Sequence, residues 1–134
     1  MTDTAVSSPE AVRRAVTAYF AATRAMDVDA WLATLDEEAR SFNPVGTPPT
    51  VGHPAHRQFF EGIVSAFETL GLTEDFVSVC ASQAAVKWTG RGKTKHGRNV
   101  RFDGIDVFEV NARGRIQQVL AYWDPATLMR EIQS

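Results

Sequence analysis

The sequence predicts an α+β fold in which helices come first and an antiparallel sheet follows. Apolar residues recur at helical spacing through the first half of the chain. After Gly71, segments rich in Val, Phe, Ile and Trp alternate with short breaks, as in strands joined by tight connections. The length of 134 residues fits one domain, 1–134, around one apolar core.

The first expected helix begins near residue 9. Ser7 and Glu10 have the spacing of a capping box, and Pro9 suits a first helical turn. The apolar face of this helix is formed by Val12, Val16, Tyr19, Phe20 and Thr23.

Two further helices are expected before the sheet. The second begins at Asp29 as its N-cap and carries Trp31, Leu32 and Leu35 on its apolar face. Residues 39–43 form a short strand, and residues 44–54, dense in Pro and Gly, form a loop. The third helix begins at Pro54, with a buried stripe of Phe59, Phe60, Ile63, Val64 and Phe67.

Four strands are expected at residues 74–82, 84–93, 98–110 and 115–123. The segment NARG, residues 111–114, fits a hairpin turn, so these strands form an antiparallel meander. Asp124 and Pro125 suit the N-cap and first position of a final helix, 125–132. A curved sheet with three helices over one face encloses a cone. The eight Phe, three Trp and two Tyr residues provide side chains that could line it around a small apolar ligand.

Composition excludes several functional classes. A net charge of −2 gives no general attraction to nucleic acid or to anionic lipid. No apolar run approaches the roughly 20 residues that cross a bilayer, and the first residues do not resemble a signal peptide. One cysteine forms no internal disulfide, and no Cys/His spacing suggests zinc. We expect a cytoplasmic protein without metal or cofactor.

Two segments resemble the nuclear-transport-factor-2-like superfamily, in its ketosteroid isomerase and SnoaL-like branch. The first is VTAYFAATRAMDVDAWLATLDEEARSFNPVGTPPTVGHPAHRQFF, and the second is RFDGIDVFEVNARGRIQQVLAYWD. The resemblance extends from about residue 9 to residue 125. It implies a cone-shaped α+β fold, a buried pocket for a small molecule, and a homodimer formed through the sheet.

The resemblance also implies roles for three residues. In ketosteroid isomerase, an aspartate base moves a proton between carbons, while a tyrosine and a neutral aspartic acid donate hydrogen bonds to the developing oxyanion. Tyr19 and Asp106 occupy the positions of the two donors. Asn43 stands where the family has its base, and a carboxamide has no site that could accept a carbon-bound proton. Phe60 stands where family members often have a supporting tyrosine.

The residues themselves leave alternatives open. Strand alternation places Asp106 on one face with Phe102 and Phe108, where burial would keep its carboxyl group neutral. From its position on the helix, Tyr19 could also be an ordinary core residue. Asn43 precedes a proline and could also be a turn residue.

Other residues are assigned from their positions on strands and loops. Trp88 and Trp123 should face inward, with Val119 on the face of Trp123, as pocket wall or as ordinary core. His53 and His56 are expected at the surface, and Cys80 is expected to be buried.

Three functions follow as hypotheses. The first is a ketosteroid-isomerase-like enzyme that acts on an apolar carbonyl compound through Tyr19 and Asp106, with steroid-like or polyketide-like substrates. A SnoaL-like polyketide cyclase, epoxide hydrolase or dehydratase is a related alternative. The second is a protein that binds a steroid-like or aromatic ligand without turnover, since position 43 lacks the base. The third is a structural interaction module.

Overall fold

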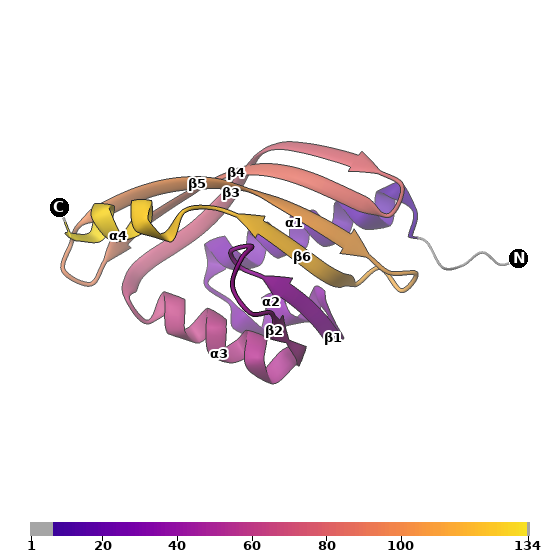
Figure 1. The fold of residues 1–134 in the computed structure, drawn as a ribbon, viewed down its shortest axis with the longest axis horizontal. Helices are drawn as coiled ribbons and strands as arrows, with labels where there is room; N and C mark the ends of the chain where they lie inside the picture. The colour runs from indigo at the N-terminus through magenta and orange to yellow at the C-terminus, as the bar shows by residue number, and fades with distance from the viewer. Residues whose placement is uncertain (1–6, 134) are drawn as a thin grey trace, which may run out of the picture.

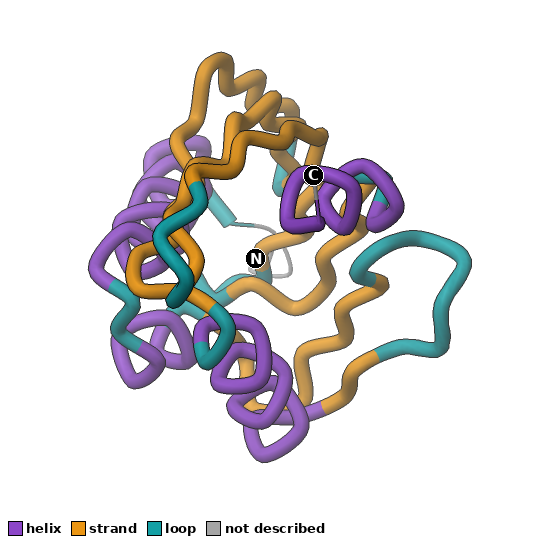
Figure 2. The backbone as a smooth tube through the Cα atoms, turned by 90° about the vertical axis from the view of Figure 1, so that its left-hand side faces the viewer, coloured by secondary structure: helices purple, strands orange, loops and turns teal. Residues whose placement is uncertain are grey.

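The computed structural model describes residues 7–133, which form a curved sheet with helices packed against its concave face. Four strands in the second half pair as an antiparallel meander, so the predicted α+β class and cone are confirmed. Figure 1 shows β3, β4 and β5 arching over the helices of the first half. Figure 2 looks at the end of the molecule where the C-terminal helix lies.

The first and last helices begin at Pro9 and Pro125 as predicted, whereas the cap of the first helix and the starts of the other two differ from the prediction. Helix α1, Pro9–Ala25, is capped by Ser8, whose Oγ accepts a hydrogen bond from the Ala11 amide at 3.1 Å, and not by Ser7. Helix α2, Val28–Ala33, is capped by Asp27, two residues before the predicted cap. Helix α3, Gly52–Val64, begins two residues before Pro54. Helix α4 spans Pro125–Gln133, with Asp124 bonded to the Ala126 amide as expected of a cap.

The sheet has six strands in the order β2-β1-β6-β5-β4-β3. Their bounds are β1 Leu35–Phe42, β2 Thr50–Val51, β3 Phe67–Cys80, β4 Gln83–Thr94, β5 Asn99–Val110 and β6 Ile116–Tyr122. Strand β1 pairs parallel to β6, which the sequence pattern did not reveal. Leu35 and Phe67 were predicted on helices, yet each opens a strand, because a buried apolar residue fits either pattern where the two meet.

Irregular pairing bends the sheet around the helices. The register between β3 and β4 shifts after Phe67 and again after Glu74, which is the signature of β-bulges. Such bulges increase local twist and curvature, so the long strand β3 can follow the helical layer and still pair with β4 along its whole length. The curvature leaves space between the layers in the middle of the molecule.

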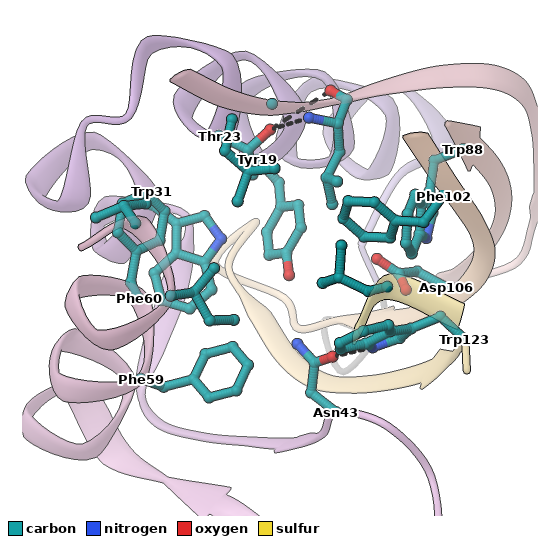
Figure 3. Close-up of a pocket in the computed structure, with 16 residues that line it drawn as sticks. Tyr19, Thr23, Trp31, Asn43, Phe59, Phe60, Trp88, Phe102, Asp106 and Trp123 are labelled. Atoms are coloured by element: carbon teal, nitrogen blue, oxygen red, sulfur yellow. Dashed lines mark hydrogen bonds between the residues drawn. The ribbon is translucent and has the colours of Figure 1, made fainter. Parts of the chain in front are cut away.

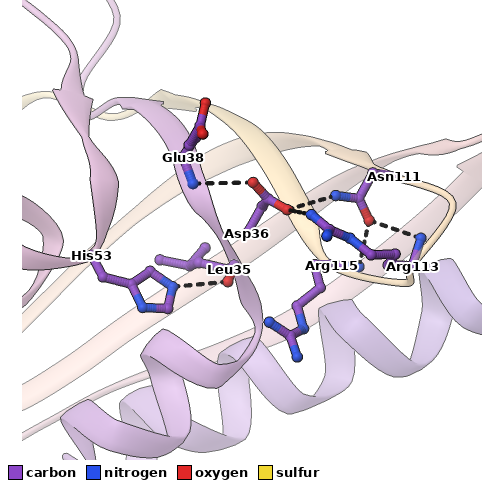
Figure 4. A network of polar contacts seen from close by, with 7 residues as sticks. All are labelled: Leu35, Asp36, Glu38, His53, Asn111, Arg113 and Arg115. Carbon is purple, nitrogen blue, oxygen red and sulfur yellow. Dashed lines mark hydrogen bonds and ion pairs between the residues drawn. The ribbon is translucent and has the colours of Figure 1, made fainter.

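A polar cluster fixes the start of β1 to the β5–β6 hairpin (Figure 4). Asp36 accepts hydrogen bonds from the Glu38 amide and from Asn111 Nδ2, both at 3.0 Å, and is paired with Arg113. The amide of Glu38 and the charge of Arg113 hold the pKa of the Asp36 carboxyl below its usual value. Nearby, His53 Nε2 bonds to the Leu35 carbonyl at 2.9 Å, which ties α3 to the same strand.

Two sequence-based expectations about burial are wrong. His56 is fully buried, although its place beside Pro54 indicated a surface position. Cys80 is exposed because it ends the edge strand β3 on the outer face. Within residues 7–133, no helix is long and apolar enough to cross a membrane.

Candidate functional site

A cavity of about 90 Å³ lies between the helical layer and the concave face of the sheet. Of the predicted site residues, all except Phe108 and Val119 line it (Figure 3). The lining residues are Tyr19, Thr23, Trp31, Asn43, Phe59, Phe60, Ile63, Val64, Leu70, Gly71, Leu72, Trp88, Phe102, Asp106, Trp123 and Leu128.

Phe108 and Val119 lie on the inner face of the sheet, as strand alternation predicted, but behind the cavity wall. Both are fully buried. The Phe108 ring packs edge-on against Tyr19 at 4.9 Å and Phe20 at 5.9 Å, measured between ring centroids. Helix α1 therefore closes this end of the cone, and these two residues support the wall.

The sheet side of the cavity depends on two pairs of a glycine and an aromatic residue on neighbouring strands. Gly90 is opposite Phe102, and Trp88 is opposite Gly104. A Cβ atom at Gly104 would lie 2.6 Å from Trp88 Cζ2, and one at Gly90 would lie 2.7 Å from Phe102 Cζ. The missing side chains thus make room for the two rings, which meet edge-on at 5.6 Å.

Asp106 is the buried acid of the site, with 2% of its surface exposed. Its partners on the neighbouring strands are Val86 and Ala121, so no charged residue flanks it across the sheet. Burial raises the pKa of this carboxyl to about 7, and the nearby Trp88 indole opposes the shift. Asp106 therefore keeps its proton to a much higher pH than an exposed aspartate does. Its Oδ1 has no hydrogen-bond partner within residues 7–133.

Tyr19 projects from α1 with its hydroxyl group pointing into the cavity (Figure 3). Burial raises its pKa far above the usual value, and the charge of Asp106 raises it further, while the Trp31 indole lowers it. The hydroxyl therefore keeps its proton at all ordinary pH values and serves as a hydrogen-bond donor.

Asn43 is held by Trp123. The indole Nε1 donates to Asn43 Oδ1 at 2.6 Å. Because an indole nitrogen only donates, this contact assigns the oxygen, and the amide nitrogen must face the other way. Figure 3 shows that nitrogen turned toward the cavity. Asn43 thus presents a donor where an aspartate would present a base.

Within residues 7–133, Trp31 is one of nine lining residues that were not among the predicted site residues. It lies on α2 with 3% exposure, and its ring centroid is 4.9 Å from Phe60 and 5.7 Å from Tyr19. Its indole Nε1 has no hydrogen-bond partner within the described part of the chain, and the same holds for Trp88 Nε1. The helical pattern had identified Trp31 only as apolar, because periodicity does not show where a core opens into a cavity.

A buried histidine supports Trp31 from behind. The rings of His56 and Trp31 have centroids 5.7 Å apart. His56 Nδ1 donates to the Gly52 carbonyl at 2.7 Å, so Nε2 of the neutral ring accepts from Ser41 Oγ, also at 2.7 Å. Burial lowers the pKa of His56, which keeps the ring neutral. His56 does not line the cavity.

The site is chemically simple. Its polar groups are hydrogen-bond donors and one acid with a raised pKa, set in an aromatic wall. Among residues 7–133, no cluster of three or more His, Cys, Asp or Glu side chains is placed to hold a metal ion. Such a site can bind an oxygen atom of an apolar ligand and stabilise negative charge on it.

Known proteins share this fold and part of this sequence. The family model described as a SnoaL-like domain matches residues 16–119. The epoxide hydrolase/cyclase-like enzyme SalBIII, of pyran ring formation in the polyether salinomycin, is 23% identical over 88% of this chain and 94% of its own, with a TM-score of 0.78.

Two structures from Mycobacterium tuberculosis are also similar. An LEH-like epoxide hydrolase is 19% identical, with a TM-score of 0.76, over 92% of this chain and 90% of its own. The protein RV0760c, in complex with estradiol-17beta-hemisuccinate, is 20% identical, with a TM-score of 0.77, over 87% of this chain and 96% of its own. At these identities the likeness establishes a common fold, and the residues of the site must carry any functional argument.

Proposed function

Because this chain belongs to the SnoaL-like domain family, within the nuclear-transport-factor-2-like superfamily, we propose that it acts on a small apolar carbonyl compound held in the aromatic cavity. Tyr19 and Asp106 donate hydrogen bonds to the carbonyl oxygen and stabilise the negative charge that develops there. The observation that carries the proposal is the buried Asp106 carboxyl, which lines an apolar cavity and lacks a partner for Oδ1.

The reaction must suit a site without a carboxylate at position 43. Removal of a general base typically lowers a rate by about 10²–10⁴. The site therefore favours substrates whose carbon-bound proton is already acidic, or steps such as aldol-type cyclisation and elimination. Each donor to an oxyanion contributes about 3–4 kcal/mol to such a step.

The raised pKa of Asp106 favours a second candidate, which is epoxide opening. An acid with a pKa of about 7 donates protons effectively at neutral pH. In that reaction Asp106 protonates the epoxide oxygen while a hydroxyl group of the substrate attacks the ring carbon and the carbon–oxygen bond of the epoxide breaks. The proton of the attacking hydroxyl group then passes through solvent to the Asp106 carboxylate, which regenerates the acid. The fold neighbours named as epoxide hydrolases support this alternative.

Binding without turnover is the third candidate, and Asn43 favours it. The bond from Trp123 directs the Asn43 amide nitrogen toward the cavity. In this role the three donors of Tyr19, Asn43 and Asp106 hold the oxygen of a steroid-like or aromatic ligand. The steroid ester bound by the fold neighbour RV0760c is a ligand of that class.

Binding and turnover assays on matched variants test the proposal. We expect the wild type to bind 4-nitrophenol, which mimics an enolate, with affinity lowered at least tenfold in Tyr19→Phe and in Asp106→Asn. We expect no isomerisation of a β,γ-unsaturated ketosteroid by the wild type and measurable isomerisation by Asn43→Asp. Equal phenol affinity in all variants would overturn the oxygen-binding role of both donors.

Epoxide turnover separates the first two candidates. A hydroxy-epoxide of polyketide type is incubated with the wild type and with Asp106→Asn, and products are followed by chromatography. Cyclisation that disappears in Asp106→Asn favours the epoxide reaction. Absence of any turnover, together with tight phenol binding, favours the ligand-binding candidate.

The outer face of the sheet supports the proposed homodimer. Ile105 on β5 and Tyr122 on β6 are cross-strand neighbours there, exposed at 45% and 48%, and Lys87 on β4 separates them from Phe76 on β3, exposed at 65%. Large apolar side chains exposed as neighbours on a sheet face are typical of an interface. Analytical ultracentrifugation should show a dimer for the wild type and a monomer for Ile105→Glu. Val51→Glu, which changes an exposed residue on β2, is the control and should remain dimeric.

A further inference from the structure

Two indole N–H groups in the cavity wall have no hydrogen-bond partner, and each lies beside one of the two acidic donors. Trp31 Nε1 and Trp88 Nε1 are both buried and unpaired within residues 7–133. Trp31 contacts Tyr19, with ring centroids 5.7 Å apart. Trp88 lies two residues along β4 from Val86, the cross-strand partner of Asp106, and therefore on the same inner face. Figure 3 shows the two indoles on opposite walls, one by each acid.

The cavity offers few acceptors for these donors. The Thr23 hydroxyl is bonded to the Phe20 carbonyl at 2.6 Å and to the Leu72 amide at 3.0 Å. Asn43 Oδ1 already accepts from Trp123. The remaining side-chain acceptors in the lining are therefore the oxygens of Tyr19 and Asp106.

Asp106 shows the matching deficit. Its Oδ1 is a buried acceptor without a partner, while Trp88 Nε1 beside it is a buried donor without one. A buried polar atom left unpaired costs about 1–3 kcal/mol, so a small movement that joins the two is favourable. Hydrogen bonds in empty sites are often long and tighten when a ligand binds.

We propose that Trp31 and Trp88 are positioning residues of the donor pair, with Trp31 donating to the Tyr19 oxygen and Trp88 donating to Asp106 Oδ1. That Tyr19 and Asp106 bind a ligand oxygen rests on the proposed function. The two indole contacts do not depend on it. Each indole N–H fixes one acid oxygen, so that the O–H of the same acid is aimed at the ligand. Donation to that oxygen also makes the O–H a stronger donor, since hydrogen bonds in a chain reinforce one another.

The third tryptophan provides an internal control. Trp123 lines the same cavity and packs against Phe102 at 5.8 Å, but its N–H is already used by Asn43. Replacing it with phenylalanine removes a similar indole without removing a bond to either acid. The comparison therefore separates the effect of a smaller ring in the cavity from the effect of losing an N–H that bonds to Tyr19 or Asp106.

The ligand-free protein tests the contact at Asp106. The Asp106 carboxyl is titrated by carbon NMR in the wild type, in Trp88→Phe and in Trp123→Phe. We expect Trp88→Phe to raise the titration midpoint by about one to two pH units, the equivalent of a lost bond to a charged group. Trp123→Phe should leave it within about half a unit. An unchanged midpoint in a folded Trp88→Phe variant would overturn the assignment.

The contact at Tyr19 is tested with bound 4-nitrophenol, whose anion absorbs visible light and whose neutral form does not. We expect Trp31→Phe to lower the ionisation constant of the bound phenol about tenfold, because Tyr19 becomes a weaker donor. Replacing Trp31 with 3-benzothienylalanine keeps the ring shape, removes the N–H and should give the same loss. Wild-type ionisation with benzothienylalanine would overturn the proposal.

The two tests fail in different ways. If 4-nitrophenol does not bind to any variant, the proposed function is wrong, while the titration of Asp106 still decides the contact with Trp88. If the phenol binds and ionises equally in the wild type and in the Trp31 variants, the proposed function stands and the positioning role of Trp31 is overturned.

Discussion

The Asp106 carboxyl makes the stability of this protein depend on pH. Its pKa is about 7 in the folded chain and near 3.8 when unfolded. The folded state therefore binds more protons between these values, and the free energy of unfolding falls as the pH rises. Relative to Asp106→Asn, which does not titrate, the wild type should lose about 2–3 kcal/mol between pH values of about 5 and about 8.

Urea unfolding of both proteins at the two pH values measures this difference. The comparison with Asp106→Asn removes the contributions of other titrating groups, which both proteins share. A constant stability difference would mean that the carboxyl is solvated in the folded protein, and Asp106 would then be a poor donor to a ligand oxygen.

His56 provides a test of the opposite sign. Its folded pKa lies below the unfolded value near 6.5, so the stability it contributes is present above that pH and is lost as the pH falls. His56→Ala removes two hydrogen bonds at 2.7 Å and opens a cavity behind Trp31. We expect His56→Ala to lower the free energy of unfolding by about 2–4 kcal/mol at neutral pH, and the difference from the wild type to become smaller below about pH 6.

The control for this variant is His53→Ala, which removes a partly exposed ring and one bond to the Leu35 carbonyl. Urea unfolding should show a loss of about 1 kcal/mol or less for it. Similar losses for both variants would mean that His56 does not support the wall from within.

At the residue scale, the sequence pattern predicted which side chains point inward from the sheet, but not how the helices pack against them. Period-two alternation placed Phe102, Asp106 and Phe108 on one face, and all three are buried. It could not show that Phe108 lies behind Tyr19, because that depends on where α1 crosses the sheet. The burial of His56 could not be predicted, because one of its two hydrogen-bond partners, Ser41, lies on β1, far from it in the sequence.

At the scale of elements, the aromatic wall depends on the register of β4 and β5. A methyl group at Gly104 would lie 2.6 Å from both Trp88 Cζ2 and the Tyr122 carbonyl oxygen. Gly104→Ala must therefore displace Trp88 or the strand β6. We expect a loss of about 1–3 kcal/mol in stability, measured in urea, together with weaker binding of 4-nitrophenol.

Gly62→Ala is the matched control. Gly62 lies within α3, and a Cβ atom there meets nothing within 4 Å. Alanine in place of glycine inside a helix should raise stability by roughly 0.5–1 kcal/mol and leave phenol binding unchanged. If Gly104→Ala behaved in the same way, the indole would not be confined as described.

Element types were easier to predict than their ends. The four strands of the meander, the α3 stripe and the final helix follow from periodicity and from the Asp124–Pro125 start signal. The cap of α2 could not be predicted from the sequence pattern, because Asp27 and Asp29 are both acceptable caps and only tertiary packing selects between them. The parallel pairing of β1 with β6 joins segments far apart in the chain and leaves no local signal.

At the scale of the whole molecule, helix α4 covers the cavity, although none of its own side chains is buried. Leu128 nevertheless reaches the cavity lining. Glu131 joins this helix to the sheet. Its backbone carbonyl accepts a hydrogen bond from Nε of Arg98, in the turn before β5, at 3.0 Å, and its Oε1 accepts one from the amide of Arg101, on β5, at 3.2 Å. Segments with few buried contacts open locally at low free energy.

Ligand entry should therefore depend on Leu128 more than global stability does. Leu128→Ala removes apolar contact at the cavity mouth, so we expect 4-nitrophenol to associate and dissociate several-fold faster, with weaker affinity, in stopped-flow measurements. Unfolding in urea should change by about 1 kcal/mol or less, because the site is only partly buried. Met129→Ala, at an exposed neighbour on the same helix that does not line the cavity, is the control and should keep wild-type rates. Equal rates in all three proteins would place the ligand path away from α4, whereas a selective effect of Leu128 makes this helix the cover of the site.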